Sequence, residues 1–151
     1  VLHQDSTNSA IFLSGGIGVT PFRSMIKYAT DMQLPVKIIM FDSNRNRNNI
    51  LFKKEFDEWA SINKNLKIIY TISEKDQNNE QSSLSNANDW KGEYGRINKA
   101  MILKYVDTNV LNNSIFYICG PPNMLKAMQI LLQEELEIPK ERIKVEEFTG
   151  Y

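Results

Sequence analysis

A glycine-rich turn near the start of the chain could hold a phosphate. Residues 16–21, Gly-Ile-Gly-Val-Thr-Pro, have the form G-x-G-x-x-P and follow an apolar run. Glycine lets the main chain approach a bulky anion without interference from a Cβ atom. A helix that begins there presents unpaired N–H groups and its positive dipole end, which suit a pyrophosphate. Short glycine motifs are weak alone, and the standard fingerprint has glycine where Pro21 stands, so an ordinary tight turn is the alternative.

Two further stretches carry candidate functional residues. Cys119-Gly120-Pro121-Pro122 follows a later apolar run, and Glu146-Glu147-Phe148 closes the last one. In open α/β sheets, ligands bind outside the carboxyl ends of the strands where the strand order reverses. If both turns leave neighbouring strands, they face one ligand. The alternatives are structural: cysteine is commonly buried at strand ends, Glu146 alternates with apolar residues, and Phe148 would suit a core.

The elements that must position these residues alternate between strands and helices. Apolar β-prone runs predict five strands, at 9–14, 36–41, 66–72, 114–119 and 143–148. Helical spacing predicts helices after Thr20-Pro21, at 50–62, after Asn98 and after Asn123, with Thr20, Asn98 and Asn123 as N-caps. The polar stretch 74–95 is expected to be a loop. This alternation predicts an α/β fold: a five-stranded parallel sheet of order 3-2-1-4-5 with helices on both faces.

With these motifs in place, the chain resembles the nucleotide-binding half of the ferredoxin–NADP reductase family. GGIGVTPF, YICGPPNM and VEEF carry the resemblance, which covers essentially the whole chain. It implies an NAD(P)H-dependent flavoprotein oxidoreductase, in which this domain places the nicotinamide for hydride transfer to FAD and onward electron transfer. The cofactors carry the chemistry, and the protein supplies positioning.

The resemblance also implies roles for individual residues. Cys119, Glu146 and Phe148 match the catalytic positions around the nicotinamide and the flavin. The matching dinucleotide-binding positions are Gly16, Gly18, Thr20, Pro21, Ser73, Glu74, Gly120, Pro121, Pro122 and Met124. The chain continues past Phe148 to Tyr151, so either aromatic ring could cover the flavin.

The residues that set the preference for NADH or NADPH are expected directly after the third strand. Family members specific for NADP often have Ser-Arg there, whereas this chain has Ser73-Glu74. An acid repels a 2′-phosphate and can accept from a 2′-hydroxyl, and Asp42 after the second strand would act likewise in a standard dinucleotide fold. Arg45, Arg47 and Lys75 argue weakly for phosphate. We expect NADH to be slightly favoured over NADPH.

The composition narrows the remaining possibilities. The 151 residues have a formal net charge of zero, which gives no reason to expect nucleic acid or an anionic membrane as partner. One cysteine and one histidine predict no metal site and suggest a cytoplasmic protein. No run approaches the roughly 20 apolar residues that span a bilayer.

The domain organisation is also an expectation. No signature of a flavin-binding barrel is present, and the chain starts at Val1 without methionine. We therefore interpret residues 1–151 as one NAD(P)-binding domain, the C-terminal half of a larger reductase whose flavin-binding barrel lies upstream in the same polypeptide. The electron acceptor, whether ferredoxin, haem or another group, is left open. The competing hypotheses are a non-catalytic dinucleotide-sensing module and an unrelated doubly wound fold such as a flavodoxin-like receiver.

Overall fold

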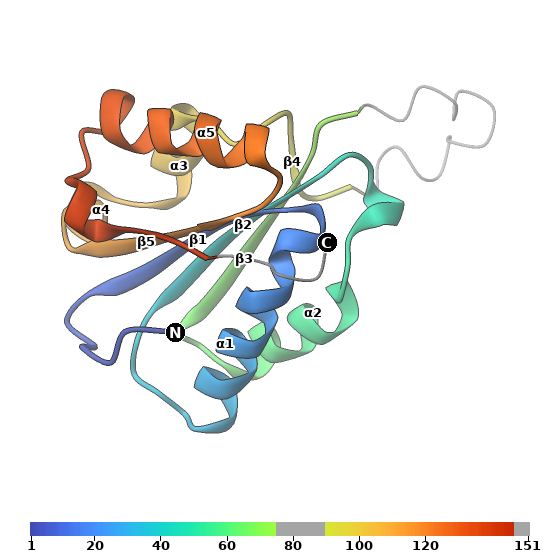
Figure 1. Ribbon diagram of the computed structural model, residues 1–151. Helices are drawn as coiled ribbons and strands as arrows, with labels where there is room; N and C mark the ends of the chain where they lie inside the picture. Colours follow the sequence, from blue (N-terminus) through green and yellow to red (C-terminus); the bar gives the residue numbers. More distant parts are fainter. Residues whose placement is uncertain (75–89, 147–151) are drawn as a thin grey trace.

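The computed structural model describes residues 1–74 and 90–146 and shows a single parallel sheet between two helical layers (Figure 1). The strands follow the order β4-β3-β2-β1-β5-β6, and every neighbouring pair is parallel. Their bounds are β1 Ser9–Gly15, β2 Ile38–Asn44, β3 Leu66–Ile72, β4 Glu93–Tyr94, β5 Ser114–Cys119 and β6 Ile143–Val145.

The α/β class and the parallel sheet are confirmed, but the number of strands is six and not five. The five expected strands keep their expected order, as β3-β2-β1-β5-β6. The sixth, β4, lies inside the stretch 74–95 that was expected to be a loop. It has two residues, which pair with Thr71 and Ile72. A strand that short has no apolar periodicity to detect.

Helices cover both faces of the sheet (Figure 1). Their bounds are α1 Thr20–Asp31, α2 Lys53–Ile62, α3 Lys99–Tyr105, α4 Thr108–Asn112 and α5 Pro122–Ile130. A π-helical turn, Leu131–Glu135, continues α5, and 3-10 turns occupy Gly16–Val19, Arg47–Asn49 and Lys140–Arg142. α1 and α2 lie on one side of the sheet, and α3 and α5 lie on the other.

One of the three expected helix caps is confirmed. The Asn98 side chain accepts a hydrogen bond from the Met101 N–H at 2.8 Å at the start of α3. Thr20 is not an N-cap, because the preceding 3-10 turn runs directly into α1 and Val19 already has helical backbone angles. Asn123 is not one either. It lies inside the first turn of α5, where Pro121 takes the cap position in extended conformation.

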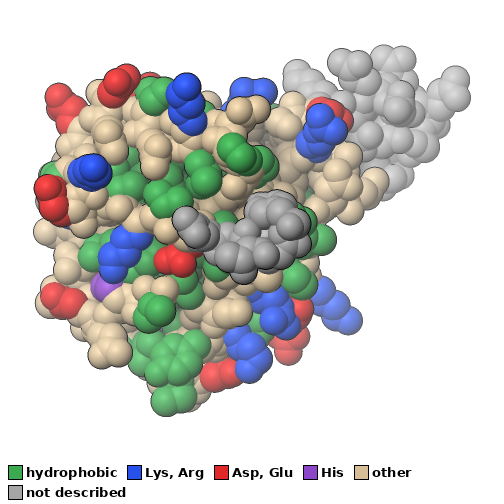
Figure 2. All heavy atoms as spheres, viewed as in Figure 1, with side chains coloured by type: hydrophobic (Ala, Val, Ile, Leu, Met, Phe, Trp, Pro, Cys, Tyr) green, Lys and Arg blue, Asp and Glu red, His purple; other side chains and the backbone are tan. Residues whose placement is uncertain are grey.

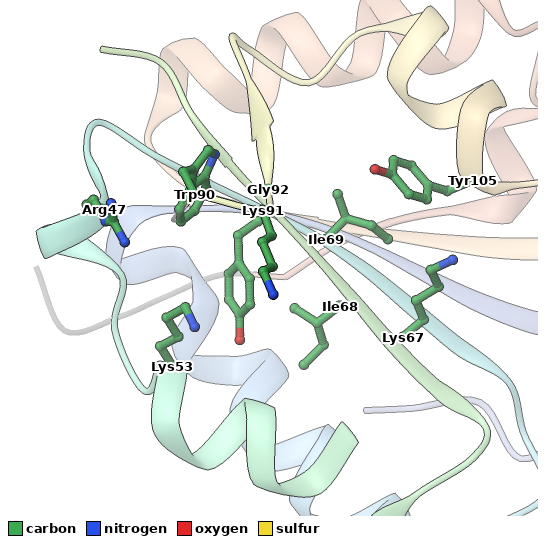
Figure 3. Close-up of a pocket in the computed structure, with 10 residues that line it drawn as sticks. Arg47, Lys53, Lys67, Ile68, Ile69, Trp90, Lys91, Gly92 and Tyr105 are labelled. Carbon is green, nitrogen blue, oxygen red and sulfur yellow. The ribbon is translucent and has the colours of Figure 1, made fainter. Parts of the chain in front are cut away.

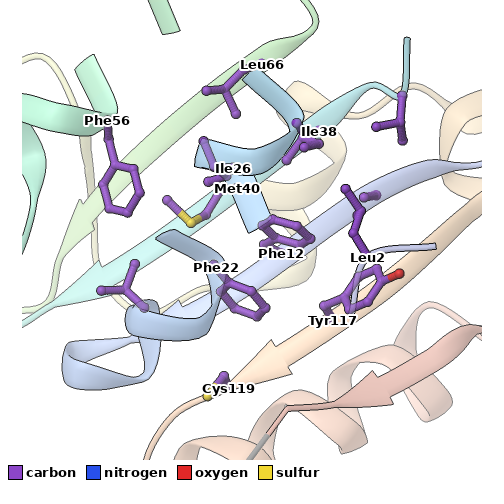
Figure 4. Packing of buried hydrophobic residues seen from close by; sticks show 14 of the residues in the cluster. Leu2, Phe12, Phe22, Ile26, Ile38, Met40, Phe56, Leu66, Tyr117 and Cys119 are labelled. Carbon is purple, nitrogen blue, oxygen red and sulfur yellow. The ribbon is translucent and has the colours of Figure 1, made fainter. Parts of the chain in front are cut away.

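Two apolar clusters fill the space between the sheet and its helices. The cluster under α1 and α2 includes Phe12, Phe22 and Tyr117, all fully buried, and Cys119 lies at one end of it (Figure 4). The cluster under α3 and α5 includes Ile102. Each fully buried large apolar side chain contributes about 1.5–3 kcal/mol. The central strands are therefore held on both faces, as their near-continuous apolar sequences predict.

The face of the molecule seen in Figure 2 has no dominant charge. Figure 2 shows acidic and basic side chains interspersed over the face turned to the viewer, in keeping with the zero net charge. Within residues 1–74 and 90–146, no helix is both long and apolar enough to cross a bilayer.

Candidate dinucleotide site

The glycine turn after β1 and the Cys-Gly-Pro-Pro turn after β5 touch one another. β1 and β5 are direct neighbours, with Ser14 level with Cys119, so both turns leave the sheet at one edge. A Cβ atom placed on Gly18 would lie 2.6 Å from the Cys119 carbonyl oxygen and 2.7 Å from the Gly120 Cα. Only glycine permits this approach. The convergence expected from the strand order is therefore observed.

Met124 from α5 packs between the same two turns. A Cβ atom on Gly15 would lie 2.1 Å from the Met124 sulfur, and one on Gly120 would lie 2.8 Å from it. Gly16 has a φ of +54° with nothing within 4 Å of its Cβ position, so it is a conformational glycine on an open side of the turn. The turns are thus held by packing while Gly16 faces free space.

A cleft of about 820 Å³ opens beside these turns, over the carboxyl ends of the strands. Four of the predicted dinucleotide-binding residues line it: Gly16, Ser73, Pro121 and Met124. Its volume lies in the range of roughly 300–1,000 Å³ that small-molecule and cofactor sites occupy. The remaining lining residues come from the glycine turn, from the end of β2 and the loop after it, from the segment after β4 and from α5.

The far end of the cleft is formed where β2 and β3 end. The Ser73 N–H donates to the Asn44 carbonyl at 2.9 Å, and the Glu74 N–H donates to the Arg45 carbonyl at 2.7 Å. The Arg45 Nε lies 3.7 Å from Glu74 Oε1, and both side chains are exposed. Arg96, which follows β4, lines the same end. The guanidinium groups of Arg45 and Arg96 are both available to an anion here, and the Glu74 carboxylate faces that of Arg45.

Cys119 and Glu146 lie together at the end of β5 and just past β6. The Glu146 N–H donates to the Ile118 carbonyl at 2.8 Å, which brings Glu146 beside the end of β5. Cys119 is 1% exposed, and burial, together with the nearby Glu146 carboxylate, raises the pKa of its thiol. The thiol therefore stays protonated at neutral pH, and Cys119 is unsuited to act as a nucleophile.

The amino-acid sequence matches a known protein family. The family model of the oxidoreductase NAD-binding domain matches residues 12–130. The chain belongs to this family.

Relatives of this oxidoreductase NAD-binding domain include a cytochrome b5 reductase and a flavohemoprotein. The chain is 31% identical over 122 residues to NADH-cytochrome b5 reductase 2 of Scheffersomyces stipitis, covering 80% of this chain and 37% of that protein. It is 28% identical over 148 residues to flavohemoprotein A of Dictyostelium discoideum, covering 98% of this chain and 32% of that protein. The chain thus spans about a third of the length of these relatives.

Solved structures share the fold. A flavohemoglobin from Malassezia yamatoensis, solved with bound FAD and heme, superposes with a TM-score of 0.74 at 21% identity, covering 96% of this chain and 33% of that one. At that identity the likeness shows the fold alone.

The other predicted site residues of this NAD-binding domain either do not line the cleft or fall outside the described residues. Thr20 uses its hydroxyl to donate to the Ile17 carbonyl at 2.9 Å, and Pro21 sits in the first turn of α1. Pro122 begins α5. Phe148 and Tyr151 fall outside the described residues, so which ring would cover a flavin stays a prediction.

Asp42 does not occupy the ribose-contacting place suggested for it. It is fully buried, and Ser14 Oγ donates to its Oδ1 at 3.1 Å. Burial raises the pKa of Asp42 to about 7, opposed by hydrogen bonding from Ser14 and by the neighbouring Asn44 amide. Asp42 Oδ2 has no hydrogen-bond partner within the described residues. β2 runs two residues past Asp42, so Asp42 lies inside the covered part of the sheet, and Ser43 and Asn44 reach the cleft instead.

Sequence reasoning missed part of the cleft wall. Arg96, Asn123 and the polar loop at Asn48 and Asn49 line the cleft without having been assigned to it. The loop gave a usable signal, because its asparagine- and arginine-rich sequence directly follows a strand that ends at the ligand-binding edge. Arg96 gave none, since its position depends on the short strand β4.

Proposed function

We propose that this NAD-binding domain binds NAD(P)H along the carboxyl ends of its strands and presents the nicotinamide to FAD held by a flavin-binding domain of the same polypeptide. The observation that carries this proposal is the contact of Gly18 with the Cys119-Gly120 turn, which joins the phosphate-type turn and the cysteine turn into one site. When bound, NAD(P)H supplies a hydride and FAD accepts it.

Different residues of the chain would bind different parts of the dinucleotide along the cleft. The 3-10 turn Gly16–Val19, which lines the cleft through Gly16 and Ile17 and runs into α1, would offer main-chain N–H groups and a positive helix end to the pyrophosphate. Ser73 and Arg45 lie at the end suited to the adenosine ribose. Cys119 and Glu146 do not line the cleft. Cys119 ends β5, two residues before Pro121 of the cleft wall, and Glu146 lies just past β6; we infer that the nicotinamide ring would be placed near them.

The domain arrangement supports a flavin-binding partner. The chain spans about a third of its relatives, whose names include a cytochrome b5 reductase and a flavohemoprotein. We infer that residues 1–151 form the C-terminal half of a larger reductase, with a flavin-binding barrel upstream. Ferredoxin, haem or another group would take the electrons onward. The single cysteine supports a cytoplasmic location.

Binding and turnover separate this proposal from a dinucleotide-sensing module. We expect the isolated chain to bind NADH in isothermal titration calorimetry without oxidising it, because it lacks an acceptor. The full-length protein should be purified with flavin, and NADH should bleach the flavin absorbance. A full-length protein that binds NADH tightly but carries no flavin would favour the sensing module instead.

A nucleotide preference for NADH is proposed from the Arg45–Glu74 pair. Glu74 offsets the charge that Arg45 would offer to a 2′-phosphate. Replacing Glu74 with glutamine should therefore strengthen NADPH binding about threefold, the effect of roughly 0.6 kcal/mol typical of an exposed ion pair. NADH binding should change little, and Glu58→Gln on the exposed side of α2 is the matched control. Clearly tighter binding of NADPH than NADH by the unmodified chain would contradict the preference.

A further inference from the structure

Within residues 1–74 and 90–146, the outer edge of β3 is only partly covered. β4 pairs with β3 at Thr71 and Ile72 alone. Gly92, just before β4, lies against the Tyr70 carbonyl, since a Cβ atom on Gly92 would be 2.5 Å from that oxygen. From Leu66 to the Tyr70 N–H, no strand of the described parts of the chain lies beside the edge. An open strand edge presents main-chain N–H and C=O groups that can template another strand.

The pairing with β2 shows which main-chain groups point outward. The Asn65 carbonyl accepts from β2, and the Ser73 N–H donates to it. Since residues of a parallel strand alternate between their two neighbours, the odd-numbered residues of β3 face β2. The outward groups are therefore the Leu66 carbonyl, both groups of Ile68 and the Tyr70 N–H.

A cleft of about 600 Å³ runs along this open edge and is lined from both faces of the sheet (Figure 3). Ile68 and Tyr70 belong to the α1–α2 face, whereas Ile69 and Tyr105 belong to the α3–α5 face. A compact ligand would contact only one of these two faces of the sheet. A cleft that wraps the edge of one strand has the shape for an extended chain, whose side chains alternate between the two faces.

The lining of the edge cleft is cationic. It contains four basic residues and no carboxylate: Arg47, Lys53, Lys67 and Lys91. Lys67 is exposed, with its ammonium 5.0 Å from the centre of the Tyr105 ring. Lys53 pairs with Asp57 at 2.7 Å, so part of its charge is offset from behind. Behind the lining, Glu93 accepts from the Tyr105 hydroxyl at 2.5 Å and pairs with Lys104. The charge that favours an acidic partner is therefore mainly that of Lys67 and Lys91.

We propose that the outer edge of β3 binds an extended acidic segment of a partner protein, which pairs with residues 66–70 as an added strand. The five residues offer about 16 Å of edge at 3.3 Å per residue. Main-chain hydrogen bonds to Ile68 and Tyr70 would supply the binding, and the cations would supply the preference for glutamate or aspartate. A second copy of this chain fits poorly, because it would bring lysines against lysines.

The test uses a short capped peptide of alternating valine and glutamate. Its binding is followed by amide chemical shifts and hydrogen exchange in the isotope-labelled chain. The Ile68 and Tyr70 amides should exchange rapidly in the free chain and about tenfold or more slowly with saturating peptide. The same peptide with lysine for glutamate, or N-methylated at alternate residues, should not protect them.

Charge reversal supplies the matched pair of variants. Lys67→Glu should weaken peptide binding about tenfold, whereas Lys140→Glu, beyond the opposite edge of the sheet, should not. Circular dichroism checks that both variants fold.

Four results would overturn the proposal. Protection of both amides in the free chain at every concentration means that the edge is covered within the chain. Protection that grows with protein concentration means a second copy. Equal binding of the N-methylated peptide would show that no main-chain pairing takes place. Full competition by inorganic pyrophosphate would show that the cleft is a site for a compact anion.

Discussion

Replacing Asp42 with asparagine should remove a pH dependence from the stability of this domain. Asp42 is fully buried, and its pKa rises from 3.8 to about 7 on folding, mainly because burial disfavours the charged carboxylate. Between these two values the folded chain keeps a proton that the unfolded chain releases. The free energy of unfolding therefore falls as the pH rises through this window, and it levels off above the folded pKa.

The size of the effect follows from the shift. A shift from 3.8 to about 7 is roughly three units, and each unit corresponds to about 1.36 kcal/mol. The carboxylate should therefore cost about 4 kcal/mol of unfolding free energy at pH 8 relative to pH 4. Asparagine keeps an oxygen that can accept from Ser14 but never ionises, so the variant should lack this loss.

Urea unfolding, followed by tryptophan fluorescence at several pH values from 4 to 8, measures the effect. The quantity to compare is the difference between the variant and the unmodified chain, because other titrating groups then cancel. That difference should grow toward pH 8. A difference that stays within about 1 kcal/mol across the range would refute the assignment of a buried, proton-holding Asp42.

Four further outcomes are expected. Gly18→Ala should cost about 3 kcal/mol of unfolding free energy and weaken NADH binding, because the new Cβ atom would meet main-chain atoms at 2.6 Å. Gly16→Ala should cost about 1 kcal/mol, because its Cβ position is open but its φ is +54°. Asn98→Ala should cost about 1 kcal/mol in urea unfolding through loss of its helix cap. Asn123→Ala should cost under about 0.5 kcal/mol, because Asn123 caps nothing. Iodoacetamide should alkylate Cys119 at least about tenfold more slowly in the folded chain than in urea, since the thiol is buried and its pKa is raised.

The long strands were predictable because parallel strands buried on both faces are continuous apolar runs. β3 and β5 have the bounds that their sequences predicted, Leu66–Ile72 and Ser114–Cys119. The relation between the two turns was also predictable, since the expected strand order made β1 and β5 neighbours. The sequence did not show how closely the two turns approach each other, because that distance depends on Gly18 packing against the main chain of Cys119 and Gly120.

The misses share a physical cause, which is that tertiary placement overrides local signals. Thr20-Pro21 has the composition of a helix start, but the 3-10 turn before it leaves no extended residue for a cap. Asp42 has the position of a ribose ligand, but the layers above and below enclose it. Arg96 reaches the cleft only because β4 adds to the edge of the sheet.

The central position of β1 has a consequence for how this chain folds during synthesis. One flank of β1 can join β2 soon after both have left the ribosome, whereas the other must wait for β5, which is encoded far downstream. Until then an apolar strand stays half-paired, and such nascent intermediates are prone to aggregation. Slow translation or chaperone binding before Ser114 emerges would therefore affect the yield of native protein more than any later delay.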